Sequence, residues 1–167
     1  IDEQIEFIDS LNRNLMKRFK IRLASDNFDW NLEERLLDSE YGNFFDNSKQ
    51  KFIPRLNGCS LSVSTSNTTT FLETLSLNFP TIVFFNPIWY EIREDAKELV
   101  ESLRRVGILH EAPNSAAIFL NGLGGDIENW WSGEELQKVR EEFCNAYALK
   151  DSDWSHQWQQ LFESLKK

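Results

Sequence analysis

An uninterrupted apolar stretch placed directly after a helical pattern most restricts the folds open to this chain. Residues 81–85 read Thr-Ile-Val-Phe-Phe, and they follow a helical pattern over residues 68–77 that Asn78-Phe79-Pro80 closes. A continuous apolar run of this length is typical of a parallel strand buried on both faces. A shorter strand signal at residues 61–64 precedes the helix, so this part of the chain predicts a right-handed βαβ unit.

The remaining patterns extend this prediction to an α/β protein. Helical spacing (Ile5, Ile8, Leu11, Leu15) spans residues 2–17, and an alternating strand pattern follows at residues 19–23. Further helices are expected around residues 32–37, 50–56, 91–106, 115–123, 133–148 and 155–165, with a possible strand at 41–45. The order predicts a Rossmann-like, doubly wound parallel sheet with a helical C-terminal third. We expect a single domain over residues 1–167, with an α/β part at 1–110 and a helical part at 111–167.

Composition excludes several functional classes. The net charge is −9 and no basic stripe is present, which argues against nucleic-acid binding and against contact with an anionic membrane. No apolar run approaches the ~20 residues that span a bilayer, so direct membrane insertion is not expected. Cys59 and Cys144 match no metal spacing and are expected to be buried free thiols. With two histidines and no paired ligand spacing, we expect no metal and no other cofactor, and a cytoplasmic location.

A dense group of hydroxyl side chains joins the first strand of the βαβ unit to its helix. The candidate residues are Ser64, Thr65, Ser66, Asn67, Thr68, Thr69 and Thr70. The first N–H groups of a helix are unpaired and lie at the positive end of its dipole, where phosphate binds readily. Glu73 follows in what the sequence suggests is the first helical turn, where a carboxylate can meet sugar hydroxyls. The alternative is that one of these residues is an ordinary N-cap and Glu73 an ordinary first-turn acid.

Several motifs in this order resemble a known family. Residues 68–82 (Thr-Thr-Thr-Phe-Leu-Glu-Thr-Leu-Ser-Leu-Asn-Phe-Pro-Thr-Ile) resemble the nucleotide-binding half of GT-B glycosyltransferases. In that half a Ser/Thr turn, a helix bearing a Glu and a Pro-led strand recur together. The Thr-Thr-Phe-Leu-Glu run, Gly107-Ile108-Leu109-His110, Ala116-Ala117 and Trp130-Trp131 are similar to a transferase family associated with O-antigen and other surface-polysaccharide biosynthesis.

The resemblance implies a donor site for a nucleotide-sugar. The turn from Ser64 to Thr70 would hold the phosphates, and Glu73 would bond to the ribose. Arg22, at the end of the strand predicted at residues 19–23, would neutralise the leaving phosphate at the carboxyl edge of the sheet. The alternative for Arg22 is a surface ion pair with Asp26 or Asp29. GT-B enzymes generally need no bound metal, which implies the same here.

The resemblance also implies that the chain is one half of a longer enzyme. A Rossmann half normally opens with a strand, but this chain opens with a helical pattern. Its first residue is Ile1 and not Met. The half that binds the glycan or glycolipid acceptor, and any peripheral attachment at the inner membrane, would lie in the rest of the parent protein. The fragment alone is therefore expected to bind a donor without turnover. The alternatives are a nucleotide-sugar epimerase or hydrolase, or a non-catalytic carbohydrate-binding or partner-binding module.

Other residues are secondary candidates. Asn86 and Tyr90 follow the buried strand, at the edge where α/β sheets bind ligands. His110 is expected at a helix end, either touching a ligand or serving as a structural histidine. Trp130-Trp131 can stack on a sugar or pack in the core. The Gly122-Leu123-Gly124-Gly125 run follows a helix, which indicates a helix terminator and not a phosphate loop.

Overall fold

The structure is a computed structural model that describes residues 2–24, 31–148 and 153–165. Within these residues a single sheet contains three parallel strands in the order β1 (Ser62–Ser64), β2 (Thr81–Phe84) and β3 (Leu109–His110). Val63 pairs with Ile82, and Val83 pairs with Leu109. The βαβ unit predicted from residues 61–85 is therefore present, and β2 is the central strand.

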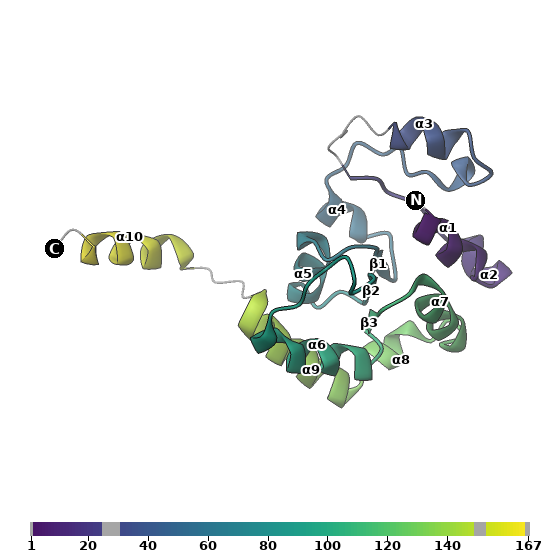
Figure 1. Cartoon of the computed structure of the whole chain (residues 1–167). Coiled ribbons are helices and arrows are strands. Elements are labelled where there is room, and N and C mark those ends of the chain that lie inside the picture. The colour runs from purple at the N-terminus through teal and green to yellow at the C-terminus, as the bar shows by residue number, and fades with distance from the viewer. Residues whose placement is uncertain (1, 25–30, 149–152, 166–167) are drawn as a thin grey trace.

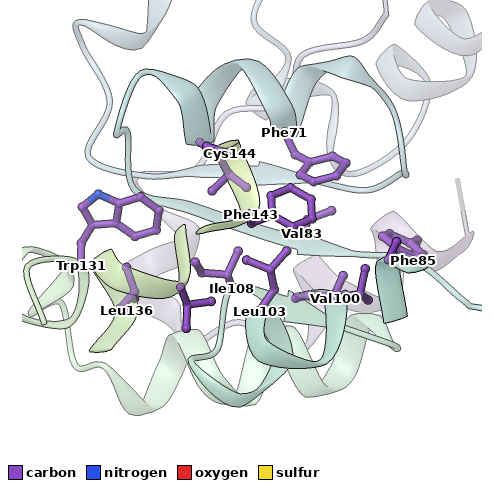
Figure 2. Close-up of a cluster of buried hydrophobic side chains, with 14 residues drawn as sticks. Phe71, Val83, Phe85, Val100, Leu103, Ile108, Trp131, Leu136, Phe143 and Cys144 are labelled. Carbon is purple, nitrogen blue, oxygen red and sulfur yellow. The ribbon is translucent and has the colours of Figure 1, made fainter. Parts of the chain in front are cut away.

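Both crossover segments lie on one face of the sheet. Helix α5 (Thr69–Ser76) connects β1 to β2, and η2 (Glu94–Ala96) with α6 (Lys97–Arg105) connects β2 to β3. Helix α9 (Glu134–Tyr147) packs against α5 and α6. Figure 2 shows the core between these helices and the sheet, to which α5 contributes Phe71, β2 contributes Val83 and α9 contributes Phe143.

The opposite face of the sheet is covered by one helix that precedes the three strands in the chain and one that follows them. Helix α1 (Asp2–Asp9) packs against α7 (Pro113–Gly122), and α7 contacts β2 and β3 (Figure 1). A second core there includes Phe7, Phe84 and Leu120. Because Ile82 and Phe84 enter this core while Val83 and Phe85 enter the first, β2 is buried on both faces, as its sequence predicts.

Shorter elements complete the described chain. They are α2 (Arg13–Met16), α3 (Leu32–Leu37), η1 (Gly42–Phe44), α4 (Phe52–Leu56), α8 (Ile127–Trp131) and α10 (Trp154–Ser164). In Figure 1, α10 lies apart from the sheet and its covering helices, and every residue from 153 to 165 is exposed. The architecture is thus an α/β domain, compatible with a Rossmann-like fold.

Three sequence predictions about the elements need correction. The continuous helix expected over residues 2–17 is two helices, because the Asn12 side chain accepts hydrogen bonds from the N–H groups of Asn14 and Leu15 and so starts α2. The strands expected at residues 19–23 and 41–45 reduce to one parallel bridge between Ile21 and Phe45, since residues 42–44 form η1.

The third correction concerns β3, which the sequence did not indicate. Leu109 and His110 form a strand of two residues, separated by Ile108 from Gly107, whose φ is +79°. A Cβ at this position would lie 2.3 Å from the Phe119 ring. Glycine therefore allows the chain to turn sharply from α6 into β3 beneath α7.

Candidate functional site

The hydroxyl-rich turn lies at the carboxyl end of β1 and leads into α5. Thr68 is the N-cap residue in extended conformation (φ −124°, ψ 178°), and its side chain accepts no hydrogen bond from the first turn of the helix. The Thr68 hydroxyl instead lies 3.1 Å from the Ser66 hydroxyl. Since the first N–H groups of a helix have no partner within it, they remain available to a ligand. The cap-only interpretation of this turn is not supported by its hydrogen bonds.

The hydroxyls of the turn differ in what they contact. Ser64 is buried and donates to the Ser66 carbonyl at 3.3 Å, and the Thr65 hydroxyl accepts a hydrogen bond from the Gln4 side chain of α1 at 3.0 Å. Asn67 and Thr69 are exposed, and Thr70 is half-buried. Ser64 and Thr65 therefore fix the turn to the domain, while the residues after them face solvent at the start of the helix.

Glu73 lies on the exposed side of α5. The helix starts at Thr69, so Glu73 is in its second turn, not in the first turn as the sequence suggested. Thr69 precedes it by four residues and therefore lies on the same face of the helix. Both residues are exposed, which places the Glu73 carboxylate one turn beyond the open helix end.

A cavity of about 280 Å³ adjoins this turn on the α5, α6 and α9 side of the sheet. Asn67 and Phe71 from the start of α5 line it, together with Phe85 after β2 and Tyr147 at the end of α9. Glu91 and Arg93 supply charged groups, and the rest of the lining is largely apolar core. Figure 2 shows Phe71, Val83 and Phe143 gathered between α5 and the sheet, where the two phenyl rings are 6.3 Å apart. The turn and the cavity share Asn67 at the carboxyl edge of the sheet.

Arg93 and Glu91 are site residues that the sequence analysis missed. The sequence analysis expected a helix from residue 91 onwards, but the helical structure begins at Glu94 with η2 and α6 begins only at Lys97. The Arg93 guanidinium bonds both carboxylate oxygens of exposed Asp95, at 3.0 and 2.7 Å. The available signal was position, because these residues follow a buried strand at the edge where ligands bind.

Two of the secondary candidates, Asn86 and Tyr90, belong to the loop after β2. The Asn86 side chain accepts a hydrogen bond from the N–H of Ile88 at 2.9 Å, so it shapes its own turn. The Tyr90 ring packs edge-on against Phe85 with centroids 5.3 Å apart. Tyr90 therefore supports a side chain that lines the cavity.

His110 lies at the end of β3, not at a helix end as the sequence suggested. Its ring packs on Phe119 of α7, with centroids 5.2 Å apart, and its Nε2 is 3.1 Å from the Gly107 carbonyl. Burial lowers the pKa of His110, against the opposing effect of this carbonyl. The neighbouring Leu109 lines the cavity, so the alternation of the strand turns His110 toward the opposite face.

Arg22 is engaged by neighbours outside the turn. Its guanidinium donates to the Gln50 carbonyl and lies 3.7 Å from Asp46, which is also bonded by Arg55 at 2.9 Å. Burial raises the pKa of Asp46, but the Ser48 N–H and the Arg55 guanidinium outweigh it and the pKa is lowered. Asp26 and Asp29, the partners suggested by sequence, lie outside the described residues. The contacts of Arg22 thus hold residues 46–55 in place, and Arg22 does not line the cavity.

The tryptophan pair and the glycine run have structural positions. Trp131 is buried and donates to Asn78, while half-buried Trp130 donates to the Val106 carbonyl at 3.0 Å. Helix α7 ends at Gly122, and Gly124 and Gly125 have positive φ, as expected of a helix terminator. Both cysteines are free, but Cys59 is exposed, which corrects the prediction that both are buried.

In the described ranges no group of three or more His, Cys, Asp or Glu side chains is arranged so that it could hold a metal ion. None of the helices seen in residues 2–24, 31–148 and 153–165 combines the length and apolarity needed to cross a bilayer. The candidate site consists of the hydroxyl turn, the open end of α5 and the adjoining cavity.

Comparison with known proteins assigns the chain to a family. Residues 1–162 match the family model described as LIC12162 family transferase. The chain belongs to the LIC12162 transferase family. No curated protein and no solved structure matches it. Membership in this family supports group transfer as the class of activity, and it confirms the transferase part of the resemblance noted from the sequence.

Proposed function

We propose that this LIC12162 family domain binds the nucleotide-sugar donor of a glycosyltransferase with GT-B architecture. The parent enzyme transfers the sugar to an acceptor hydroxyl in surface-polysaccharide biosynthesis of the O-antigen kind. The transferase family and the parallel α/β sheet support this proposal. The acceptor binds to another part of the parent enzyme, in the cytoplasm or at the inner face of its membrane.

The observation that carries the proposal is that the uncapped N-terminal end of α5 adjoins a cavity. The phosphates bind the free N–H groups and hydroxyls at the start of α5, where Thr68 leaves the helix uncapped. The group attached to the phosphates enters the cavity, which Asn67 and Phe71 connect to the turn. A mostly apolar cavity with a few charged groups is typical of small-molecule sites.

The chemistry is displacement of a nucleoside phosphate by the acceptor hydroxyl. The new bond joins the acceptor oxygen to the anomeric carbon, and the bond from that carbon to the phosphate oxygen breaks. The acceptor hydroxyl gives its proton to a general base in another part of the parent enzyme, and the electron pair of the broken bond leaves with the phosphate. Charge on the departing phosphate is met by the helix dipole and by N–H and hydroxyl donors already in position. In this proposal Arg93 supplies a positive charge on the cavity wall, and Glu73, exposed in the second turn of α5, accepts a hydrogen bond from the ribose.

Replacement of Thr68 by Asp tests the phosphate site. The carboxylate caps α5, which leaves stability unchanged or raises it by about 1 kcal/mol, but it occupies the anion site and repels phosphate. Calorimetric titration of the wild type with UDP, GDP and CMP identifies the nucleotide that binds best. We expect Thr68→Asp to bind that nucleotide with at least about tenfold lower affinity, equivalent to about 1.4 kcal/mol. Ser115→Asp adds the same charge to the exposed first turn of α7 and should leave affinity unchanged.

Glu73→Ala tests the ribose contact separately. Glu73 is exposed, so the variant should fold normally while binding the nucleotide less tightly. Equal affinities of wild type and Glu73→Ala would exclude the role given to Glu73. If none of the three nucleotides binds, or if Thr68→Asp binds as tightly as wild type, the donor-site proposal is wrong.

A further inference from the structure

Helix α10 carries an apolar face that none of the described residues covers. Its large side chains are Trp154, Trp158, Leu161 and Phe162, and Leu165 follows in the next turn. The exposed fraction of each of these five side chains lies between 47% and 71%. Their spacing of three and four residues places them on one side of the helix, where the Trp158 and Phe162 rings are 5.5 Å apart.

A helix of this kind needs a packing partner to be stable. Isolated helices shorter than ~12–15 residues are marginal in water, and α10 has 11 residues. Exposed apolar faces of this kind mark interaction sites. The length and the exposure together indicate that α10 is completed by contact with another surface.

The charge of the helix restricts what that surface is. Between Trp154 and Ser164 the one acidic residue is Glu163, and neither Lys nor Arg occurs. Amphipathic helices that lie on anionic membranes carry Lys and Arg on the polar face, which α10 lacks. Two chains with a net charge of −9 repel each other over most of their surface, but two nearly neutral α10 helices approach without this cost.

The apolar area of α10 is sufficient for a pair of such helices. A large aromatic side chain has about 150–250 Å² of surface and leucine somewhat less. Because 47% to 71% of each of these five side chains is exposed, together they contribute roughly 500 Å² per chain. Two copies together bury about 1,000 Å², the lower limit for a specific interface. A pair related by a two-fold axis brings the same face of each helix together, which requires only that the face complement itself.

We propose that α10 is the contact through which two copies of this chain form a dimer. Sedimentation equilibrium of the 167-residue chain over a range of concentrations should show a species of twice 19.6 kDa that dissociates on dilution. Trp158→Glu and Phe162→Glu each place a charge in the centre of the face and should give monomers. Gln160→Glu adds the same charge to the opposite side of α10 and should leave the dimer intact.

Three outcomes would overturn the proposal. The first is a wild-type chain that remains monomeric up to about 100 μM. This is the result expected when α10 packs on its own domain instead of on a second copy. The second is a dimer that persists in both Trp158→Glu and Phe162→Glu. The third is a monomer that binds neutral phosphatidylcholine vesicles through α10.

Because α10 is exposed, unchanged urea unfolding of the variants shows that the domain itself is intact. Nucleotide titration of the same variants reports separately on the donor site.

Discussion

Tyr41 is a buried residue whose contact ties distant parts of the chain together. Its hydroxyl donates to the Asp9 carboxylate at the end of α1, and its ring lies in the core beneath α1 and α7. The hydrogen bond to Asp9, together with burial, raises the pKa of Tyr41 from 10.0 to about 12. One side chain thus connects the segment around η1 to the first helix.

The raised pKa makes a pH dependence testable. Because the folded pKa lies above the unfolded value, the neutral phenol is favoured by folding, so its stabilisation is complete below pH 10 and is lost as pH rises toward about 12. Alkaline titration followed by phenolate absorbance should show one late-titrating tyrosine. Asp9→Asn should move that step back toward pH 10, whereas Asp2→Asn on the same helix should not. A step unchanged by Asp9→Asn would contradict the assigned cause.

At the scale of elements, the two ends of α5 differ in their hydrogen-bond partners. At the C-terminal end, Asn78 adopts the left-handed conformation (φ 52°) and the Phe79 N–H donates to the Thr74 carbonyl. Arg140 of α9 also donates to the Leu75 carbonyl there, at 3.1 Å. The N-terminal end has no side-chain cap. Contacts with the domain therefore hold α5 by its C-terminal end and leave its positive end open for a ligand.

Arg140→Met tests the support of α5 by α9. Arg140 is 8% exposed, and Met fills the space of its stem but leaves the Leu75 carbonyl without this donor. We expect a loss of about 2–3 kcal/mol in the free energy of unfolding, measured by urea denaturation. Arg140→Lys keeps a charge with fewer donors and should lose less. A change below about 0.5 kcal/mol in Arg140→Met would show that this contact does not support α5.

At the scale of the whole molecule, two hydrophobic cores share one small sheet. Ile82 contributes to the core with α1 and α7, and Val83 contributes to the core with α5, α6 and α9. Both residues are 0% exposed. With three short strands in the described chain, the sheet has few backbone hydrogen bonds, so its stability depends on the helices that cover both faces.

Substitutions in β2 measure the two cores separately. Ile82→Ala and Val83→Ala should each lower the free energy of unfolding by about 2–4 kcal/mol, since each leaves a cavity in a different core. Although the two residues are adjacent in β2, their side chains lie on opposite faces of the sheet and enter different cores, so the double variant should lose close to the sum. Ile88→Ala, at an 80% exposed position beyond β2, should change stability by less than about 0.5 kcal/mol. A double variant that loses clearly less than the sum would contradict separate cores.

The sequence predicted those parts of the fold that depend on local pattern. The apolar run at β2 and the helical spacing of α3, α5 and α9 appear where the residues indicate. A strand buried on both faces reads as a short continuous apolar run between turn residues, and an amphipathic helix has a period of about 3.6 residues. The segment from Leu109 to His110 was missed, since two residues are too short to show a period. The hydroxyl turn was visible because its residue types are unusual and adjacent in sequence.

What the sequence by itself determined is the βαβ unit and the residues at the start of α5, since both follow from neighbours along the chain. The tertiary structure decided what stands around that turn. It placed Arg93 and Tyr147 on the wall of one cavity, turned His110 to the opposite face, and engaged Arg22 with Gln50 and Asp46. Such relations depend on strand register and helix packing between segments far apart in the chain, which no local pattern encodes.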